Sequence, residues 1–243
     1  MNDAFRPARE PVLNLPGAVA GLVAAFIALH VVRGFLSPDA DLEVLLLFAF
    51  IPVRYTPEAL QGFEFPGGLA GDVWTFVTYA MLHGSWTHLF INALWLVAFG
   101  SAVARRFGTA RFLLFSAVCA VAGAALHLAT HVGDPAPVVG ASAAISGQMA
   151  AAVRFVFAMG GPLGALRARG QWAFTQPAPP IAAVLSSPGA LGFVGVWFAL
   201  NLLVGLFAVP FIGEGGTVAW QAHIGGFLAG FLLFPLFDPV PRR

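Results

Sequence analysis

The sequence is poor in charged residues, and it has no lysine and only one cysteine. Of its 243 residues, 9% are charged and 59% are hydrophobic, with a mean hydropathy of +0.85. An ordinary soluble domain is about 25% charged and about 45–50% apolar, so this chain has too few charged residues to cover a water-exposed surface. The composition excludes a soluble cytosolic enzyme, a nucleic-acid-binding protein and a disordered chain.

Two further absences narrow the class of protein. The lone Cys119 permits no intrachain disulfide, and its apolar surroundings in the sequence indicate a packing role. The apolar stretches do not alternate with polar residues, which argues against a membrane β-barrel. The first apolar run follows a polar start and has no small-residue cleavage site, so we interpret it as a spanning helix rather than a signal peptide. A helical membrane protein with several spans remains.

Six apolar segments are each about 20 residues long, the length that a spanning helix needs. They lie at 17–36, 85–104, 110–131, 141–159, 190–211 and 219–237. We therefore predict an all-α membrane domain of six helices over 17–238, with tails at 1–16 and 239–243. A long first loop covers 37–84 and contains a short apolar patch, 45–53, which we expect to be interfacial or re-entrant. A second loop, 160–189, is rich in proline, glycine and arginine.

The distribution of charge predicts the orientation. All basic residues are arginine, and with the N-terminus in the cytoplasm ten of the twelve fall on the cytoplasmic side. Only Arg33 and Arg54 fall on the other side, where most of the acidic residues lie. The expected orientation is N-in and C-in, which agrees with an even number of spans. The cytoplasmic arginines are Arg6, Arg9, Arg105, Arg106, Arg111, Arg154, Arg167, Arg169, Arg242 and Arg243.

The few polar residues near the apolar segments share one depth. Polar groups inside a membrane are costly and usually functional. His83, His88 and Asn92 lie at the start of the second segment, Ser142 at the start of the fourth, and His223 near the start of the sixth. These three segments run in the same direction, so all five residues are expected near the outer face.

Ser142 follows Gly140 at the start of a small-residue segment. A helix N-terminus offers unpaired backbone N–H groups and the positive end of the helix dipole, which suit a developing oxyanion. Taken alone, G-x-S in a small-residue helix is weak evidence, and a simple helix N-cap is the favoured interpretation.

His223 shares a helix face with Gly226 and Gly230, which allow close helix approach. A matching small face of Ser142, Ser146 and Ala150 could receive that helix. Docking of the two faces would give a serine nucleophile with an adjacent histidine base.

His88 and Asn92 are four residues apart, so they share a face and could complete an oxyanion hole with the Ser142 backbone N–H. Zinc binding is the rival interpretation of the histidines. The sequence lacks H-E-x-x-H and has no intramembrane carboxylate beside them, so we predict neither a metal nor a cofactor. His127 and His131 are expected to be interfacial, and His30 structural.

Together these motifs resemble the rhomboid family of intramembrane serine proteases. The family's W-x-x-x-T appears at Trp74 to Thr78, and its H-x-x-x-x-H-x-x-x-N at His83, His88 and Asn92. Its G-x-S appears at Gly140 to Ser142, and its A-H-x-x-G-x-x-x-G at Ala222, His223, Gly226 and Gly230. The match covers about 72–232.

The resemblance implies a role for each residue. Ser142 would be the nucleophile and His223 the general base of a dyad without a third acid. His88 and Asn92 would donate to the oxyanion, and His83 would be structural beneath the first loop. Trp197 and Phe198 would form a lateral gate for a substrate helix.

Three positions depart from the family pattern. Thr75 follows Trp74 where arginine is frequent, Ala143 replaces a frequent glycine after the nucleophile, and Ser146 replaces a frequent aromatic residue. None of these changes removes a group that attacks a carbonyl or transfers a proton.

The expected function is hydrolysis of single-span membrane proteins, embedded in lipid, at the periplasmic side of a bacterial inner membrane. The alternatives are a non-proteolytic rhomboid-like protein that binds membrane clients and a small transporter or channel. A transporter predicts charged residues at mid-membrane, where we find only Arg154, which we expect to snorkel towards the cytoplasm.

Overall fold

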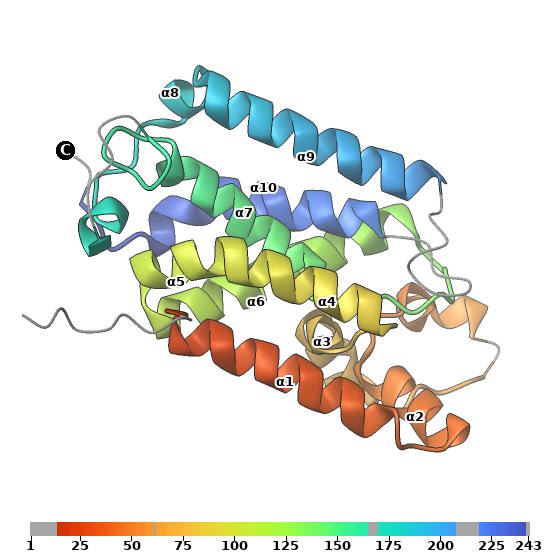
Figure 1. The fold of residues 1–243 in the computed structure, drawn as a ribbon. Helices are drawn as coiled ribbons and strands as arrows, with labels where there is room; N and C mark the ends of the chain where they lie inside the picture. Colours follow the sequence, from red (N-terminus) through yellow and green to blue (C-terminus); the bar gives the residue numbers. More distant parts are fainter. Residues whose placement is uncertain (1–13, 61, 165–169, 208–218, 242–243) are drawn as a thin grey trace, which may run out of the picture.

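The computed structural model describes residues 14–60, 62–164, 170–207 and 219–241, with side chains of α9 described as far as 203. The described chain is helical, and its β structure is one isolated bridge (Figure 1). The helices are α1 Gly17–Arg33, α2 Pro38–Phe48, α3 Gly68–Thr78, α4 Trp86–Trp95, α5 Ser101–Phe107, α6 Thr109–Thr130, α7 Ser142–Val156, α8 Ile181–Leu185, α9 Pro188–Phe207 and α10 Trp220–Phe237. Short 3₁₀ turns lie at 52–55, 57–59, 79–81 and 170–174.

Each of the six predicted apolar segments overlaps a helix. Among the described residues, three helical stretches are long and apolar enough to cross a membrane: Trp86–Phe107, Thr109–Thr130 and Trp220–Phe237. The first of these joins α4 and α5 through a single π-helical turn, Leu96–Gly100. The stretches Gly17–Arg33 and Pro188–Leu203 are shorter apolar helices.

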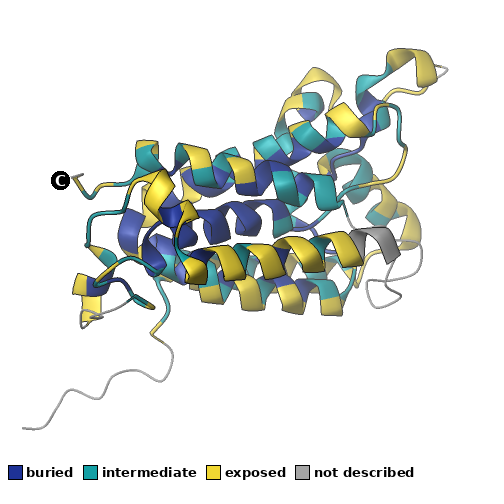
Figure 2. Ribbon diagram, turned by 90° about the horizontal axis from the view of Figure 1, so that it is seen from above, coloured by how far each residue is buried: buried dark blue, intermediate teal, exposed yellow. Residues whose placement is uncertain are grey.

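Helix α7 is the centre of the molecule. It is only 15 residues long, and every residue after Ser142 is buried (Figure 2). The surrounding helices include α4, α5, α6 and α10. A helix that is surrounded by other helices needs small side chains to allow close packing, which explains its run of alanine, glycine and serine. The predicted segment 141–159 is therefore longer than the helix.

Helix α10 packs against α7 with their backbones in contact. A Cβ on Gly226 would overlap the Ala143 carbonyl, and a Cβ on Gly230 would overlap Gly147. The small face that we predicted on α7 is thus wrong by one position: the glycines meet Ala143 and Gly147, not Ser142, Ser146 and Ala150. Ser142 lies beside the first turn of α10, outside the glycine contact.

The segment 37–84 is a folded unit rather than an extended loop. The Trp74 indole donates a hydrogen bond to the Leu47 carbonyl at 2.7 Å, and the Thr78 hydroxyl donates to Phe48 at 2.8 Å. These bonds use carbonyls at the C-terminal end of α2 that have no partner within the helix. The apolar patch 45–53 thus forms the last turn of α2 and the residues that follow it.

Arg54 supplies an internal anchor for this unit. Its guanidinium is buried, forms an ion pair with Asp72 and donates to the Leu46 and Pro66 carbonyls. Thr75, the departure from the family pattern, is fully buried and shares a hydrogen bond of 2.8 Å with the Tyr55 hydroxyl. The unit therefore has polar anchors although no arginine follows Trp74.

Arg154 has a structural role that differs from our prediction. Its side chain is buried instead of snorkelling, and it donates a hydrogen bond of 2.9 Å to the Phe231 carbonyl of α10. The residue four positions later is Pro235, which has no N–H to donate to that carbonyl. Arg154 thus satisfies a carbonyl that a proline leaves open.

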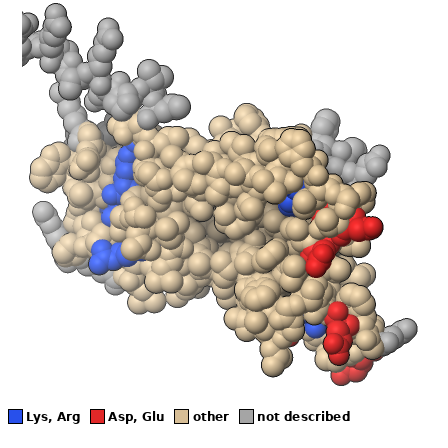
Figure 3. Space-filling model, turned by 90° about the horizontal axis from the view of Figure 1, so that it is seen from below, with Lys and Arg blue, Asp and Glu red and all other residues tan. Residues whose placement is uncertain are grey.

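One end of the molecule is mainly acidic and the other mainly arginine-rich, although basic side chains also appear at the acidic end (Figure 3). Arg33 and Arg54 pair there with Asp41 and Asp72. The arginine end includes Arg105 and Arg106 at the end of α5 and Arg111 at the start of α6. Arg106 forms a two-armed ion pair with Asp238, just beyond α10. Of the predicted cytoplasmic arginines, Arg6, Arg9, Arg167, Arg169, Arg242 and Arg243 lie outside the described residues.

Candidate active site

Ser142 and His223 meet through a hydrogen bond. The distance between Ser142 Oγ and His223 Nε2 is 2.8 Å, although the residues are 81 positions apart. Ser142 is the first residue of α7, and His223 lies in the first turn of α10. A serine hydroxyl held against an imidazole nitrogen is the arrangement of an activated nucleophile and its base.

The turn before Ser142 requires glycine. Gly140 has φ +115°, and its N–H donates to the Tyr79 carbonyl at 3.0 Å. A Cβ at this position would lie 2.7 Å from His88 Nε2. Two residues earlier, Val138 forms the bridge with Phe50. The folded unit 37–84 thus holds the turn before Ser142, and the backbone of this turn lies close to the His88 ring.

His88 and Asn92 lie on α4 and line the same cavity as Ser142. Ser85 caps this helix by accepting a hydrogen bond from the His88 N–H at 3.1 Å. Asn92 is buried, and its amide donates to the His88 carbonyl at 2.9 Å. An amide nitrogen carries two hydrogens, so one remains for a group in the cavity.

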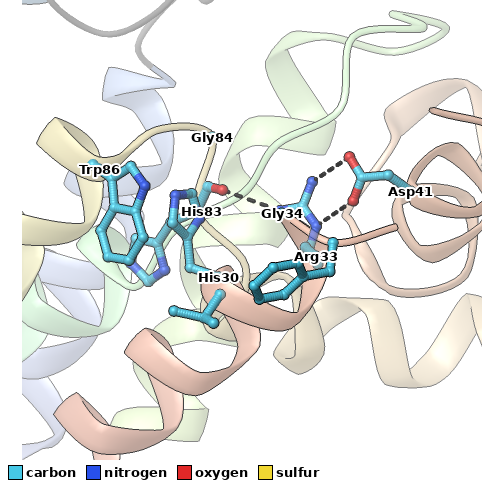
Figure 4. A pocket seen from close by; sticks show the side chains of 9 residues that line it. His30, Arg33, Gly34, Asp41, His83, Gly84 and Trp86 are labelled. Atoms are coloured by element: carbon cyan, nitrogen blue, oxygen red, sulfur yellow. Dashed lines mark hydrogen bonds and ion pairs between the residues drawn. The ribbon is translucent and has the colours of Figure 1, made fainter. Parts of the chain in front are cut away.

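His83 lies behind His88 rather than in the cavity. Its ring is fully buried, packs against Phe26 of α1, and has its centroid 5.3 Å from that of His88. Arg33, paired with Asp41, donates to the His83 carbonyl at 3.0 Å (Figure 4). Burial first, and the neighbouring His88 second, lower the pKa of His83 to about 3. A ring that stays neutral in this position suits a supporting role.

His30 also belongs to this supporting cluster. Its ring meets the Trp86 indole edge-on at a centroid distance of 4.6 Å (Figure 4). This contact joins α1 to the start of α4.

The cavity around Ser142 has a volume of about 820 Å³ and a mixed lining. Its apolar side lies between α4 and α9, with Ile91 and Trp95 on one helix and Val196 and Leu200 on the other. Phe99, in the π-helical turn after α4, contacts Phe193 of α9, with the ring centroids 5.4 Å apart. The two helices that border this side are thus in contact through these rings.

The two predicted gate residues have different positions. Trp197 lines the cavity but is buried, with its ring stacked 4.5 Å from that of Phe227 on α10. Phe198 is not among the residues that line the cavity, and it also contacts Phe227. Both side chains thus attach α9 to α10.

His127 and His131 line the cavity too, whereas we expected them to be interfacial. Their rings stack at a centroid distance of 4.3 Å, and His127 is buried. They face the site because the outer end of α6 borders it.

Asn201 of α9 is the site residue that the sequence analysis missed. Its Oδ1 lies 2.5 Å from His223 Nδ1, on the opposite side of the ring from Ser142. It is the only amide or charged side chain in α9. An isolated polar residue in an apolar helix was therefore the available signal.

Comparison with known proteins shows the family to which the chain belongs. The family model described as the rhomboid domain matches residues 70–238, more than half of the chain. The chain belongs to the rhomboid family.

Three bacterial relatives show how far the similarity extends. YdcA of Bacillus subtilis, whose name assigns it provisionally to the rhomboid proteases, is 34% identical over 127 residues, 50% of this chain and 61% of YdcA. The rhomboid protease GluP of the same species is 38% identical over 81 residues, 33% of this chain and 15% of GluP. The uncharacterized protein Rv1337 of Mycobacterium tuberculosis is 26% identical over 175 residues, 70% of this chain and 62% of Rv1337. The chain thus covers less than two thirds of each.

The surroundings of Ala143 and Ser146 account for two of the departures from the usual rhomboid sequence. The Ala143 methyl lies against Gly123 of α6, away from the cavity. Ser146 turns its hydroxyl back to the Ser142 carbonyl at 2.7 Å. In this rhomboid protein His223 has two polar contacts, one to Ser142 on α7 and one to Asn201 on α9.

Proposed function

We propose that this rhomboid protein is an intramembrane serine endopeptidase with Ser142 as nucleophile and His223 as general base. The hydrogen bond of 2.8 Å between Ser142 Oγ and His223 Nε2 is the observation that carries the proposal. It lies in a cavity large enough for a short extended peptide segment.

The reaction follows from the positions of these groups. Ser142 Oγ attacks the scissile carbonyl carbon while its proton passes to His223 Nε2. The oxyanion accepts hydrogen bonds from His88, Asn92 and the Ser142 backbone N–H. His223 then gives the proton to the leaving amine, and a water molecule hydrolyses the acyl-enzyme by the reverse sequence.

The proposed substrates are single-span membrane proteins that enter between α4 and α9. The apolar lining of Ile91, Trp95, Val196 and Leu200 suits a helix arriving from lipid. Extended backbone is costly in hydrocarbon, so substrates with helix-breaking residues near the cut site are expected.

The proposed topology has six spans with both ends in the cytoplasm of a bacterial cell and the site on the periplasmic side of the inner membrane. The separation of arginine and acidic ends supports this orientation. A client-binding protein without activity is disfavoured because Ser142 and His223 are both present and in contact. A transporter is disfavoured because Arg154 contacts the backbone of α10.

Ser142→Ala and His223→Ala test the proposal in detergent with a transmembrane substrate. We expect cleavage to fall by about 10⁴-fold or more in each variant. Ser186→Ala is the matched control. Ser186 directly follows α8 and is exposed, so its substitution should leave the rate unchanged. A fluorophosphonate should label the wild type and not Ser142→Ala. Cleavage by Ser142→Ala at the wild-type rate would overturn the assignment.

A further inference from the structure

Asn201 contacts the face of His223 that Ser142 does not use. The two ring nitrogens of His223 are thus both engaged, Nε2 by Ser142 at 2.8 Å and Nδ1 by Asn201 at 2.5 Å. In the described part of the chain, no carboxylate hydrogen-bonds to this histidine. The amide is therefore the polar group that faces Nδ1.

A second hydrogen bond settles the orientation of this amide. Asn201 Nδ2 donates to the Trp197 carbonyl at 2.9 Å, which leaves Oδ1 directed at His223. A carbonyl-type oxygen only accepts, so Nδ1 must carry the ring proton. Nε2 then has its lone pair free for the Ser142 hydroxyl, which is the tautomer that a general base requires.

We propose that Asn201 is a positioning residue that holds His223 in this tautomer and orientation. The proposal rests on the proposed peptidase function and adds a third residue to its two reacting groups. An amide fits this place because it orients the ring without the cost of burying a second charge in an apolar helix.

The position of Asn201 also makes α9 part of the catalytic apparatus. Trp197, one turn away on the same helix, stacks on Phe227 of α10 and sets the spacing between the two helices. The contact between Asn201 and His223 therefore exists only while α9 lies against α10. Because α9 also borders the proposed entry route, a displacement of α9 from α10 would break this contact.

Two substitutions separate positioning from packing. Asn201→Leu keeps the branching of the side chain, removes the acceptor and suits an apolar helix, so the fold should persist. We expect kcat to fall by about 10–100-fold with little change in KM, the loss expected for one partly buried hydrogen bond to the base. Asn201→Asp keeps an acceptor oxygen at the same place but loses the donor to the Trp197 carbonyl and adds a charge, so it should recover part of kcat.

The controls distinguish this inference from the proposed function. Leu203→Ala changes an exposed residue of the same helix and should retain the wild-type rate. Labelling by a small soluble fluorophosphonate should slow in Asn201→Leu by the same factor as cleavage, because the probe does not need substrate entry from lipid. Wild-type kcat in Asn201→Leu, with Ser142→Ala inactive, would overturn the role of Asn201 alone. Equal losses in Asn201→Leu and Asn201→Asp would also overturn it.

Discussion

At the scale of single residues, the site depends on close backbone approaches as much as on its polar groups. Gly140 has a positive φ, and the His88 ring occupies the space where a side chain would begin. The turn before Ser142 and the ring of His88, the proposed oxyanion donor, are thus in close contact. A change of one methyl group at this position should therefore affect chemistry.

Gly140→Ala tests this fit. The new Cβ would lie 2.6 Å from His88 Cε1, so the ring must move away from the oxyanion site. We expect kcat to fall by about 10²–10³-fold, the loss typical of a missing oxyanion donor. Substrate cleavage and fluorophosphonate labelling both measure it.

Gly133→Ala is the matched control for Gly140→Ala. Gly133 also has a positive φ, +78°, but a Cβ there meets nothing within 4 Å. The control shares the backbone strain and leaves His88 in place, so cleavage should stay near the wild-type rate. Equal losses in both variants would show that backbone strain, and not His88, is responsible.

The proposed reacting residues could be identified from sequence, and the residues that surround them less so. Ser142 and His223 stand in recognisable motifs, and polar residues in apolar segments are few. Asn201 stands in no motif, and its role depends on how α9 docks on α10, a tertiary contact. The cavity-facing position of His127 likewise depends on which face of α6 the other helices cover.

At the scale of elements, hydropathy predicted where helices occur but not what surrounds them. The predicted segment 141–159 contains α7, which is only 15 residues long and is enclosed by other helices. The helices α2 and α3 were not predicted, because each is only 11 residues long. Hydrogen bonds from Trp74 and Thr78 to backbone carbonyls join them. Such bonds form between segments distant in sequence, and periodicity carries no information about them.

The contact between Arg154 and α10 gives a prediction about stability. Arg154→Met should destabilise the protein, because it removes a charged donor from the partly buried Phe231 carbonyl at a cost of about 1–3 kcal/mol. Pro235→Ala supplies a backbone N–H to the same carbonyl. The arginine substitution should therefore cost less in the Pro235→Ala background.

A double-mutant cycle measures this coupling, with unfolding in detergent as the readout. The four proteins are the wild type, the two single variants and the double variant. Strictly additive effects would show that Arg154 does not compensate for the proline. A coupling free energy well above about 0.5 kcal/mol, with the arginine substitution costing less in the Pro235→Ala background, would show that the two residues act on one carbonyl. Coupling of the opposite sign would contradict the prediction.

At the scale of the whole molecule, the arginine and acidic ends give a test of orientation. The lone Cys119 is buried, so the wild type is a silent background for thiol labelling. Phe63→Cys places an exposed thiol at the acidic end, and Arg111→Cys places one at the arginine end. In the proposed topology only the first thiol faces the outside of the cytoplasmic membrane.

A membrane-impermeant maleimide applied to intact cells should therefore label Phe63→Cys and leave Arg111→Cys unlabelled until the membrane is opened. The physical reason is the positive-inside rule, which retains arginine-rich segments in the cytoplasm. Substrate cleavage by both variants confirms that they are folded. The reverse labelling pattern would place Ser142 and His223 at the cytoplasmic face, and the proposed substrates would then have to unwind on that side.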